Sequence, residues 1–178
     1  MMKKISVSLF AFMLCAACFA KDLVASDFII VKKKGAITLS ERWITGTRNE
    51  PVRELKAEFL VKSNIEEVIC LLKNQSAGIK WNKNASIYKI ANSANNNEWI
   101  NYIKYDMPPM FSDQECCLLY KAPITFPPYQ NVFVINFESA TCSSFPFKPG
   151  VKRITGVMGK CKIEQQENNF LKITYIIS

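Results

Sequence analysis

The stretch RELKAEFLVKSNIEEVICLL, residues 53–72, decides the fold class because it reads as a strand followed at once by a helix. From Leu55 to Val61 every second residue is apolar, and charged residues stand at positions 54, 56 and 58. A period of two places alternate side chains on opposite faces of an extended chain. The pattern therefore predicts that Arg53–Lys62 is a half-buried strand with one apolar face.

The helix is predicted to begin within Ser63-Asn64-Ile65-Glu66, which has the pattern of a capping box. In that motif the Ser63 hydroxyl accepts a backbone hydrogen bond and the Glu66 carboxylate reaches back to the N-cap. The helix is expected to fray over Asn74–Gly78, with Trp81 packing under the following turn. Apolar residues follow at the spacing of one helix face, namely Ile65, Val68, Ile69 and Leu72.

On both sides of this unit the chain is predicted to form short strands bounded by turn residues. Lys34-Gly35 separates the first two strands as a hairpin turn. The result is an α+β domain: a curved antiparallel β-sheet of about seven to nine strands, with one main helix after the third strand. The other expected strands are Phe28–Lys33, Ala36–Ile44, Ser86–Ala91, Glu98–Tyr105, Gln114–Lys121, Asn131–Glu138, Val151–Glu164 and Asn169–Ile177.

The first 20 residues have the composition of an export signal. Lys3 and Lys4 precede the apolar run Ile5–Phe19, and the run ends in Cys18-Phe19-Ala20, with charged residues resuming at Lys21. The run is shorter than the roughly 20 residues that a membrane span requires. The sequence thus predicts a signal peptide over 1–20 and a secreted or periplasmic domain over 21–178. The alternative is a lipoprotein anchored to a membrane through Cys18.

Composition excludes several kinds of site. The chain has no histidine, which removes the base of Ser-His-Asp and Cys-His sites and the usual zinc ligand. No metal or cofactor is therefore expected. The formal net charge is +8, but the basic residues are scattered, so no nucleic-acid partner is expected. An odd number of cysteines follows the signal and leaves open one disulfide or buried thiols, among Cys70, Cys116, Cys117, Cys142 and Cys161.

Taken in order, these segments resemble a START (StAR-related lipid-transfer) domain, the lipid-transfer module of the helix-grip, or Bet v 1-like, superfamily. The resemblance covers about residues 27–178. It is carried by short motifs spread along the chain: Trp43-Ile44-Thr45-Gly46, Arg53–Phe59, Ile65–Leu72, Trp81-Asn82, Trp99-Ile100-Asn101-Tyr102, Met107–Cys117, Ile154-Thr155-Gly156 and Leu171–Ile177.

The resemblance implies a curved sheet that holds one sterol, phospholipid or other apolar ligand beneath a C-terminal helix, in a carrier or sensor without catalysis. Two departures stand out. Gln114-Glu115 occupies the place of a usual Arg-Asp pair, which removes an expected charged cavity contact. Only Ser178 follows the strand Leu171–Ile177, so we expect a domain that is C-terminally truncated relative to the family. A partner or second subunit would then cover the open groove.

Alternation along the strands nominates the residues that face the ligand. Asn101, Gln114 and Tyr120 are expected to orient its polar end, whereas Cys117 points to the opposite face. A plain packed core would produce the same alternation without any ligand. The predicted ligand-binding set is Trp99, Asn101, Ile103, Gln114, Cys116, Leu118, Tyr120, Phe133, Ile135, Phe137, Ile173 and Tyr175.

Four apolar residues in loops, Met110, Phe111, Phe145 and Phe147, are candidates for transient membrane contact during ligand exchange. The alternative is that they cap the core.

Two enzymatic alternatives and one non-enzymatic alternative stay open. An aromatase/cyclase-like enzyme of the same superfamily would act through Tyr120 and Glu115. A glycosidase-type site would need two carboxylates about 5–10 Å apart, such as Asp113 with Glu115 or Asp106 with Glu138. The third alternative is a truncated interaction domain.

Overall fold

The computed structural model describes residues 26–93, 95–123 and 131–178, so the predicted signal and Cys18 lie outside the described residues. Two helices, one 3-10 turn and ten strands are present in this part of the chain. The helices are α1 (Ile65–Leu72) and α2 (Gln75–Trp81), and the 3-10 turn spans Glu167–Asn169. The strands are β1 (Ile29–Lys34), β2 (Ile37–Thr45), β3 (Pro51–Lys62), β4 (Ala85–Asn92), β5 (Glu98–Tyr105), β6 (Gln114–Lys121), β7 (Val132–Ser139), β8 (Lys152–Arg153), β9 (Met158–Gln165) and β10 (Phe170–Ile177).

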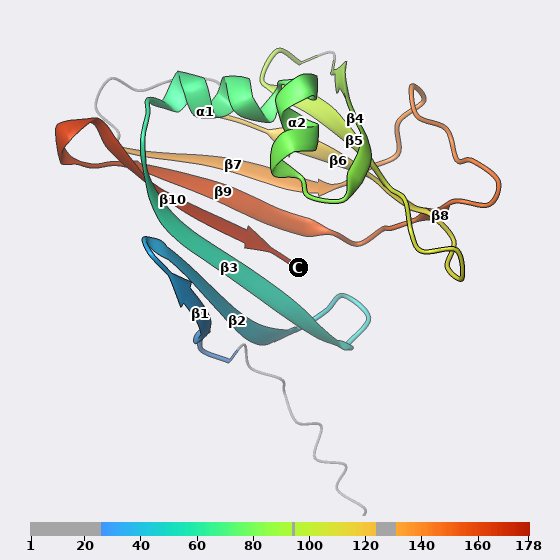
Figure 1. Cartoon of the computed structure of the whole chain (residues 1–178), viewed down its shortest axis with the longest axis horizontal. Helices are drawn as coiled ribbons and strands as arrows, with labels where there is room; N and C mark the ends of the chain where they lie inside the picture. Colours follow the sequence, from blue (N-terminus) through green and yellow to red (C-terminus); the bar gives the residue numbers. More distant parts are fainter. Residues whose placement is uncertain (1–25, 94, 124–130) are drawn as a thin grey trace, which may run out of the picture.

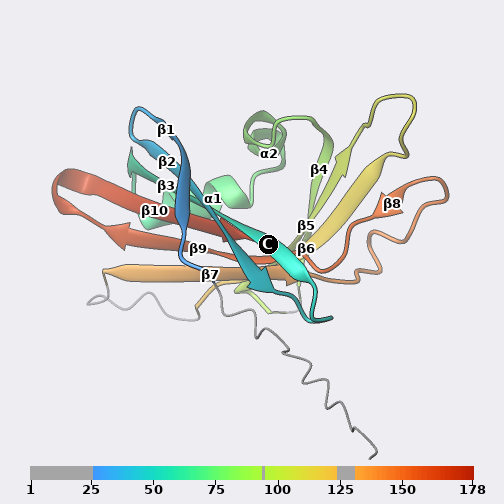
Figure 2. The same ribbon diagram turned by 90° about the horizontal axis from the view of Figure 1, so that it is seen from below.

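The strands form one sheet in the order β1-β2-β3-β10-β9-β7-β6-β5-β4, with antiparallel neighbours throughout. The two-residue β8 lies off this path and pairs parallel with β6. The sheet curves strongly, and both helices lie in its concavity between the β1–β3 arm and the β4–β6 arm (Figure 1, Figure 2). The predicted α+β class and curved antiparallel sheet are confirmed.

The concave face holds the main core because α1 brings its apolar stripe down onto the sheet. Leu72 is buried, and the other three stripe residues pack against the buried cluster of the sheet: Ile65, Val68 and Ile69. The main helix therefore buries the face that its periodicity predicts.

The N-cap of α1 is Asn64, one residue later than predicted. Its side chain accepts a hydrogen bond from the Glu67 amide at 2.8 Å, and the Glu67 carboxylate accepts one from the Asn64 amide at 3.3 Å. Ser63 instead donates its hydroxyl to Glu67 at 2.6 Å. Both Ser-x-x-Glu and Asn-x-x-Glu fit the capping pattern. The extended backbone of Asn64 places its own side chain over the first turn.

The segment expected to fray is a second helix, α2. Asn74 caps it by accepting a hydrogen bond from the Ala77 amide at 2.9 Å. Gly78, which suggests a break in the helix, is instead needed for packing. A Cβ at this position would lie 2.1 Å from Cδ1 of Tyr88, so the missing side chain lets α2 lie directly on β4.

The expected single strand over Val151–Glu164 is divided into β8 and β9. Gly156, between them, has φ +82°, a left-handed conformation that an extended strand does not contain. The chain turns there, and β8 pairs with the first two residues of β6 while β9 enters the middle of the sheet.

Candidate functional site

The inner, concave face of the sheet gathers most of the predicted ligand-facing residues. Of the twelve, ten are buried side chains of the core. They come from the three neighbouring strands β5, β6 and β7 and from β10, as the predicted alternation requires. These ten are Trp99, Asn101, Ile103, Cys116, Leu118, Tyr120, Phe133, Ile135, Phe137 and Ile173.

A row of stacked aromatic rings crosses this face from β5 to β10. Trp99 stacks on Tyr120 with ring centroids 5.2 Å apart. Tyr120 stacks on Phe137 at 5.0 Å, and Phe137 stacks on Tyr175 at 5.2 Å. Gly159 of β9 makes the last step possible, since a Cβ there would lie 2.4 Å from Cζ of Phe137. We call Trp99, Tyr120, Phe137 and Tyr175 the aromatic row.

A small polar network lies under the end of α1. Tyr88 donates its hydroxyl to the Leu72 carbonyl at 3.1 Å, and Asn101 donates its amide to the Tyr88 hydroxyl at 2.5 Å. Two buried atoms on the same face of β5 have no hydrogen-bond partner: Nε1 of Trp99, a donor, and Oδ1 of Asn101, an acceptor. Since buried polar atoms are nearly always paired, these two mark a place where water or a ligand group completes the network.

The titratable phenols and the thiol in the core of the inner face are uncharged. Burial raises the pKa of Tyr105 and Tyr175 to about 12, and it also raises the pKa of Tyr88 and Tyr120. All four phenols are therefore protonated near neutral pH. The same cause raises the pKa of the inner-face thiol Cys116 to about 11. A group on this face can donate or accept hydrogen bonds, but these side chains offer no charge.

Two openings lead toward the inner face. One of the two half-buried predicted residues, Gln114 and Tyr175, lies at each opening. Gln114 helps to line a hollow of about 730 Å³ between the α2–β4 turn and the β5–β6 loop. Its other lining residues include Tyr105, Met107 and Ile154. Tyr175 lies on β10 at the second opening.

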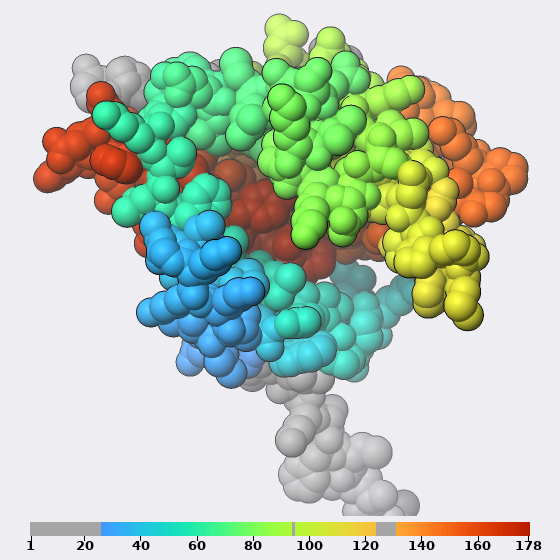
Figure 3. Space-filling model, in the orientation of Figure 1, coloured from blue at the N-terminus to red at the C-terminus, as the bar shows by residue number. Residues whose placement is uncertain are grey.

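The second opening is a recess between the β1–β3 arm and α2, floored by β10 (Figure 3). The inner-face residues that surround Tyr175 there are only half-buried, in contrast to those under the helices. By strand register they are Leu39, Leu55, Ala57, Phe59 and Ile177. We call this region the recess.

Glu115 lies on the opposite, outer face, in a second small cluster. Its carboxylate accepts hydrogen bonds from the Tyr102 hydroxyl at 2.6 Å and from Arg153 at 2.5 and 2.8 Å. Burial opposes ionisation, but the bonds from Tyr102 and Arg153 prevail and hold the pKa of Glu115 below its usual value. The interpretation of Glu115 as a cavity acid acting with Tyr120 is therefore wrong, since the two side chains lie on different faces of β6.

The replacement of an Arg-Asp pair by Gln114-Glu115 was expected to remove a charged contact, and this expectation needs correction at Glu115. Glu115 keeps a charged partner, Arg153 of β8, which sequence analysis did not identify. The guanidinium also donates to Sγ of Cys117 at 3.3 Å and to the Phe145 carbonyl at 3.0 Å. Cys117 points to this outer face, as alternation predicts.

The loop residues divide into two kinds. Phe145 stacks on Tyr102 with centroids 4.8 Å apart and packs half-buried against the outer cluster, as the capping alternative predicts. Met110, Phe111 and Phe147 are 92%, 65% and 64% exposed. Their two loops are neighbours, because the Lys152 amide donates to the Asp113 carbonyl at 2.8 Å.

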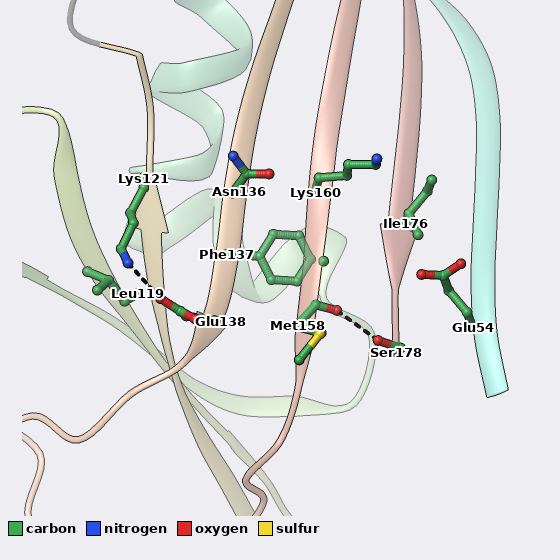
Figure 4. A pocket seen from close by; sticks show the side chains of 11 residues that line it. Glu54, Leu119, Lys121, Asn136, Phe137, Glu138, Met158, Lys160, Ile176 and Ser178 are labelled. Atoms are coloured by element: carbon green, nitrogen blue, oxygen red, sulfur yellow. Dashed lines mark hydrogen bonds and ion pairs between the residues drawn. The ribbon is translucent and has the colours of Figure 1, made fainter. Parts of the chain in front are cut away.

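A further hollow of about 350 Å³ lies on the outer face over β7, β9 and β10 (Figure 4). Its rim includes the exposed ion pair Lys121–Glu138, with Lys160 and Ser178 nearby. Of the predicted ligand-facing residues, Phe137 alone lines it, so this hollow is separate from the inner-face site.

Within 26–93, 95–123 and 131–178 there is no cluster of three or more metal-ligating side chains. No helix in these ranges has the length and apolar character needed to cross a membrane. Cys70, Cys116, Cys117, Cys142 and Cys161 are all free thiols in this structure. Asp113 is held by Lys104 at 2.7 Å, and Glu138 pairs with Lys121.

No protein-family model matches the sequence. No curated protein matches it either. The fold, by contrast, is shared with several solved structures. A STAR-related lipid transfer protein from Xanthomonas axonopodis (fragment 25–204) superposes with a TM-score of 0.69 at 16% identity, covering 85% of this chain and 80% of that one.

Two human structures are also similar. StAR-related lipid transfer protein 5 gives a TM-score of 0.61 at 17% identity over 84% of this chain and 70% of that one. STARD10 gives 0.63 at 12% identity over 84% of this chain, which spans 59% of that chain. At these identities the likeness establishes the fold: this chain has a START-like, helix-grip α+β fold.

Proposed function

We propose that this START-like domain binds a lipid or another apolar small molecule and carries or senses it without catalysing a reaction. The proposal depends chiefly on the inner face, which is largely apolar and reached from two openings. A site of this kind, with a few polar groups among apolar and aromatic side chains, is typical of small-molecule binding. The solved structures of similar fold include proteins whose names describe lipid transfer.

The unpaired Trp99 Nε1 and Asn101 Oδ1 support a ligand with one polar end. They offer one donor and one acceptor within an otherwise apolar face. Each of the two atoms can pair with a ligand hydroxyl or with a bound water. Gln114 and Tyr175, at the two openings, are the predicted binding residues that a ligand meets first.

The first test is the content of the purified protein. Organic extraction followed by mass spectrometry is expected to release a lipid at up to one molecule per protein. Transfer of fluorescent sterol, phosphatidylcholine and fatty acid from donor to acceptor vesicles then measures carriage. A protein that is purified empty and binds none of the three probes would overturn the proposal.

We propose further that Met110, Phe111 and Phe147 touch a membrane while ligand is exchanged. They are exposed apolar residues on adjacent loops, and Lys148 and Lys152 lie close in sequence to Phe147. Such a combination favours an anionic surface.

A matched pair of variants tests the membrane contact. Phe111→Ser is expected to lower binding to anionic vesicles several-fold. Leu60→Ser changes a residue of similar exposure, 53% against 65%, on the distant β3 strand and is expected to leave binding unchanged. Equal effects of both variants, or of neither, would contradict this contact.

Export is also a proposal. It is supported by the composition of residues 1–20, and N-terminal sequencing of the protein recovered outside the cytoplasm is its test. A mature chain that begins at Lys21 is expected. An acylated N-terminal Cys18 would favour the lipoprotein instead, and an uncleaved cytoplasmic chain would contradict export.

The proposal of a partner or second subunit over the recess has its own measurement. Sedimentation of the purified chain with and without bound lipid distinguishes a monomer from a dimer. A dimer that dissociates when lipid binds is the expected sign that subunit and ligand compete for the recess.

A further inference from the structure

The cysteines in the described part of the chain are divided between the two faces of the sheet. Cys116 and Cys161 are buried in the core of the inner face, and Cys70 is exposed on α1. Cys117 and Cys142 are both buried in the outer cluster. A disulfide needs Cα atoms within about 7 Å of each other, so its two cysteines must share a face. The pairs to consider are therefore Cys116 with Cys161 and Cys117 with Cys142.

The strand register keeps the inner-face pair apart. Cys161 of β9 is opposite Ile135 of β7. On the other side of β7, Leu118 of β6 is opposite Ser139, so Cys116 is level with residue 141. Positions 135 and 141 are separated by about 20 Å at the usual rise of a strand. Cys116 and Cys161 cannot be joined across that distance.

The outer-face pair, by contrast, is nearly level. The Ala140 amide donates to the Cys117 carbonyl at 3.0 Å, which continues the β6–β7 ladder by one position. Cys142 follows two residues later and begins a turn, in which the Phe145 amide donates to the Cys142 carbonyl at 3.1 Å. From residue 140 to residue 150 Cys142 alone is fully buried. This side chain therefore anchors the β7–β8 loop in the cluster that contains Cys117.

The surroundings of the two thiols suit disulfide exchange. Burial raises the pKa of Cys117, the Arg153 cation opposes this, and the neighbouring Cys142 thiol adds to the rise. Nη1 of Arg153 donates to Sγ of Cys117 at 3.3 Å, and a cation at this distance stabilises a thiolate, the attacking form in exchange. Cys142 is 9% exposed and Cys117 is 1% exposed, so a reagent meets Cys142 first.

We propose that Cys117 and Cys142 form an intramolecular disulfide when the protein meets an oxidising disulfide, and that this bond fixes the loop carrying Phe147 to β6. The oxidant is a disulfide R-S-S-R of a small thiol or of an oxidoreductase. The Cys142 thiolate attacks one sulfur of the oxidant, which forms a mixed disulfide and releases one R-S thiolate. The Cys117 thiolate then attacks the Cys142 sulfur and releases the second. The two protons of the cysteine thiols pass to the released thiolates, and the oxidant takes up the two electrons that the cysteines lose.

The inference goes beyond the proposed lipid binding, since it does not depend on what the inner face holds. It agrees with the proposed export, because disulfides form and persist in exported proteins. The structure, in which both thiols are free, corresponds to the reduced form.

Peptide mapping of the full-length mature protein tests the bond. The folded protein is incubated with oxidised glutathione, alkylated, and digested with trypsin without reduction. Trypsin places residues 105–121, with Cys116 and Cys117, and residues 122–152, with Cys142, in separate peptides. These two peptides are expected to be joined, and Cys70 and Cys161 to be alkylated. Unjoined peptides, or a joint that includes Cys70 or Cys161, would overturn the inference.

Two adjacent variants identify the sulfur on β6. Cys116→Ser and Cys117→Ser change neighbouring buried residues that point to opposite faces. The joined peptides are expected to persist in Cys116→Ser and to be absent from Cys117→Ser. The opposite result would overturn the pairing.

A stability measurement tests the bond without any variant. Reduction of the oxidised protein is expected to lower its urea midpoint by about 1–2 M, because the bond closes the chain between residues 117 and 142. In Cys142→Ser the reductant is expected to leave the midpoint unchanged. An oxidised protein whose midpoint does not respond to reductant would contradict the bond.

Limited digestion with chymotrypsin tests the effect on the loop. Phe147 and Phe111 are 64% and 65% exposed, so they are matched cleavage sites on two loops. Oxidation is expected to slow cleavage after Phe147 several-fold and to leave cleavage after Phe111 unchanged. Equal slowing at both sites, or no slowing at Phe147, would contradict the fixed loop. Because the oxidant is added to the purified protein, failure of these tests leaves the proposals of lipid binding and export standing.

Discussion

Replacing Arg153 by methionine is the sharpest test of the outer-face cluster. Arg153 is 4% and Glu115 0% exposed at the side chain, so both charges are almost completely removed from solvent. The guanidinium donates to the Glu115 carboxylate, to Cys117 and to two loop carbonyls, those of Phe145 and Pro146. Methionine keeps most of the volume of the side chain but makes none of these bonds.

The expected loss of stability at pH 7 is about 3–5 kcal/mol, because removing one member of a buried pair leaves an uncompensated charge. Part of this loss is the cost of leaving the Glu115 carboxylate buried without a cationic partner. The double variant Glu115→Gln, Arg153→Met is therefore expected to be less destabilised than Arg153→Met by itself. Tyr102 can still donate to the amide oxygen of the glutamine.

The pH dependence has a definite sign. Since the folded pKa of Glu115 lies below its usual value, its contribution to stability is present above about pH 4.5 and is lost as the pH falls further. Without Arg153, burial is no longer opposed by a cation and the pKa of Glu115 should rise. In the variant, protonation of Glu115 removes an unpaired buried charge and so limits the loss of stability. In the unmodified protein, the same protonation breaks the ion pair with Arg153 and lowers stability. The difference in stability between the two proteins therefore shrinks toward low pH.

Urea unfolding followed by tryptophan fluorescence at pH 7, 5.5 and 4 measures these differences. Arg48→Met, at an exposed turn residue, is the matched control and is expected to change stability by less than about 0.5 kcal/mol. A loss below about 1 kcal/mol for Arg153→Met at pH 7, or a loss that does not vary between pH 7 and pH 4, would refute the reasoning.

Three further outcomes are expected. Gly78→Ala should destabilise the protein by about 1–3 kcal/mol in thermal unfolding, because its Cβ meets the Tyr88 ring at 2.1 Å; an unchanged midpoint would contradict the close packing of α2. Asn64→Ala should cost about 1 kcal/mol in urea unfolding and more than Ser63→Ala, and the reverse order would restore Ser63 as the cap. Phe111→Ser should leave the thermal midpoint unchanged, since this side chain is 65% exposed, and a large drop would show that the loop caps the core.

The division of the sheet into two faces could be predicted from sequence because it is a local property of each strand. On β5, Trp99 and Asn101 lie inside and Tyr102 lies outside, as alternation requires. The resemblance to START domains supplied the curved sheet that surrounds the helix. Together these two sources predicted the inner face almost residue by residue, while the binding role of its members stays a prediction.

Non-local contacts could not be predicted in this way. Glu115 and Arg153 are separated by 38 positions and meet only because β8 turns at Gly156 and pairs with β6. The second helix was missed since Gly78 indicates a break, although the glycine is there to admit Tyr88. Which inner-face residues are open to a ligand depends on the cover that α1 and α2 provide, and no periodicity contains that information.

The pairing of β3 with β10 has a consequence for the time course of folding. This central pairing joins Lys62 to Phe170 and Leu55 to Ile177, so most of the described chain lies between the two partners. Closing so long a loop delays the contact that unites the two arms, and sheets rich in such distant pairings fold in milliseconds to seconds rather than microseconds. During synthesis the apolar face of β3 must wait, uncovered, until β10 has been made. A chaperone that shields Leu55, Phe59 and Val61 would therefore act on the nascent chain earlier than any ligand can.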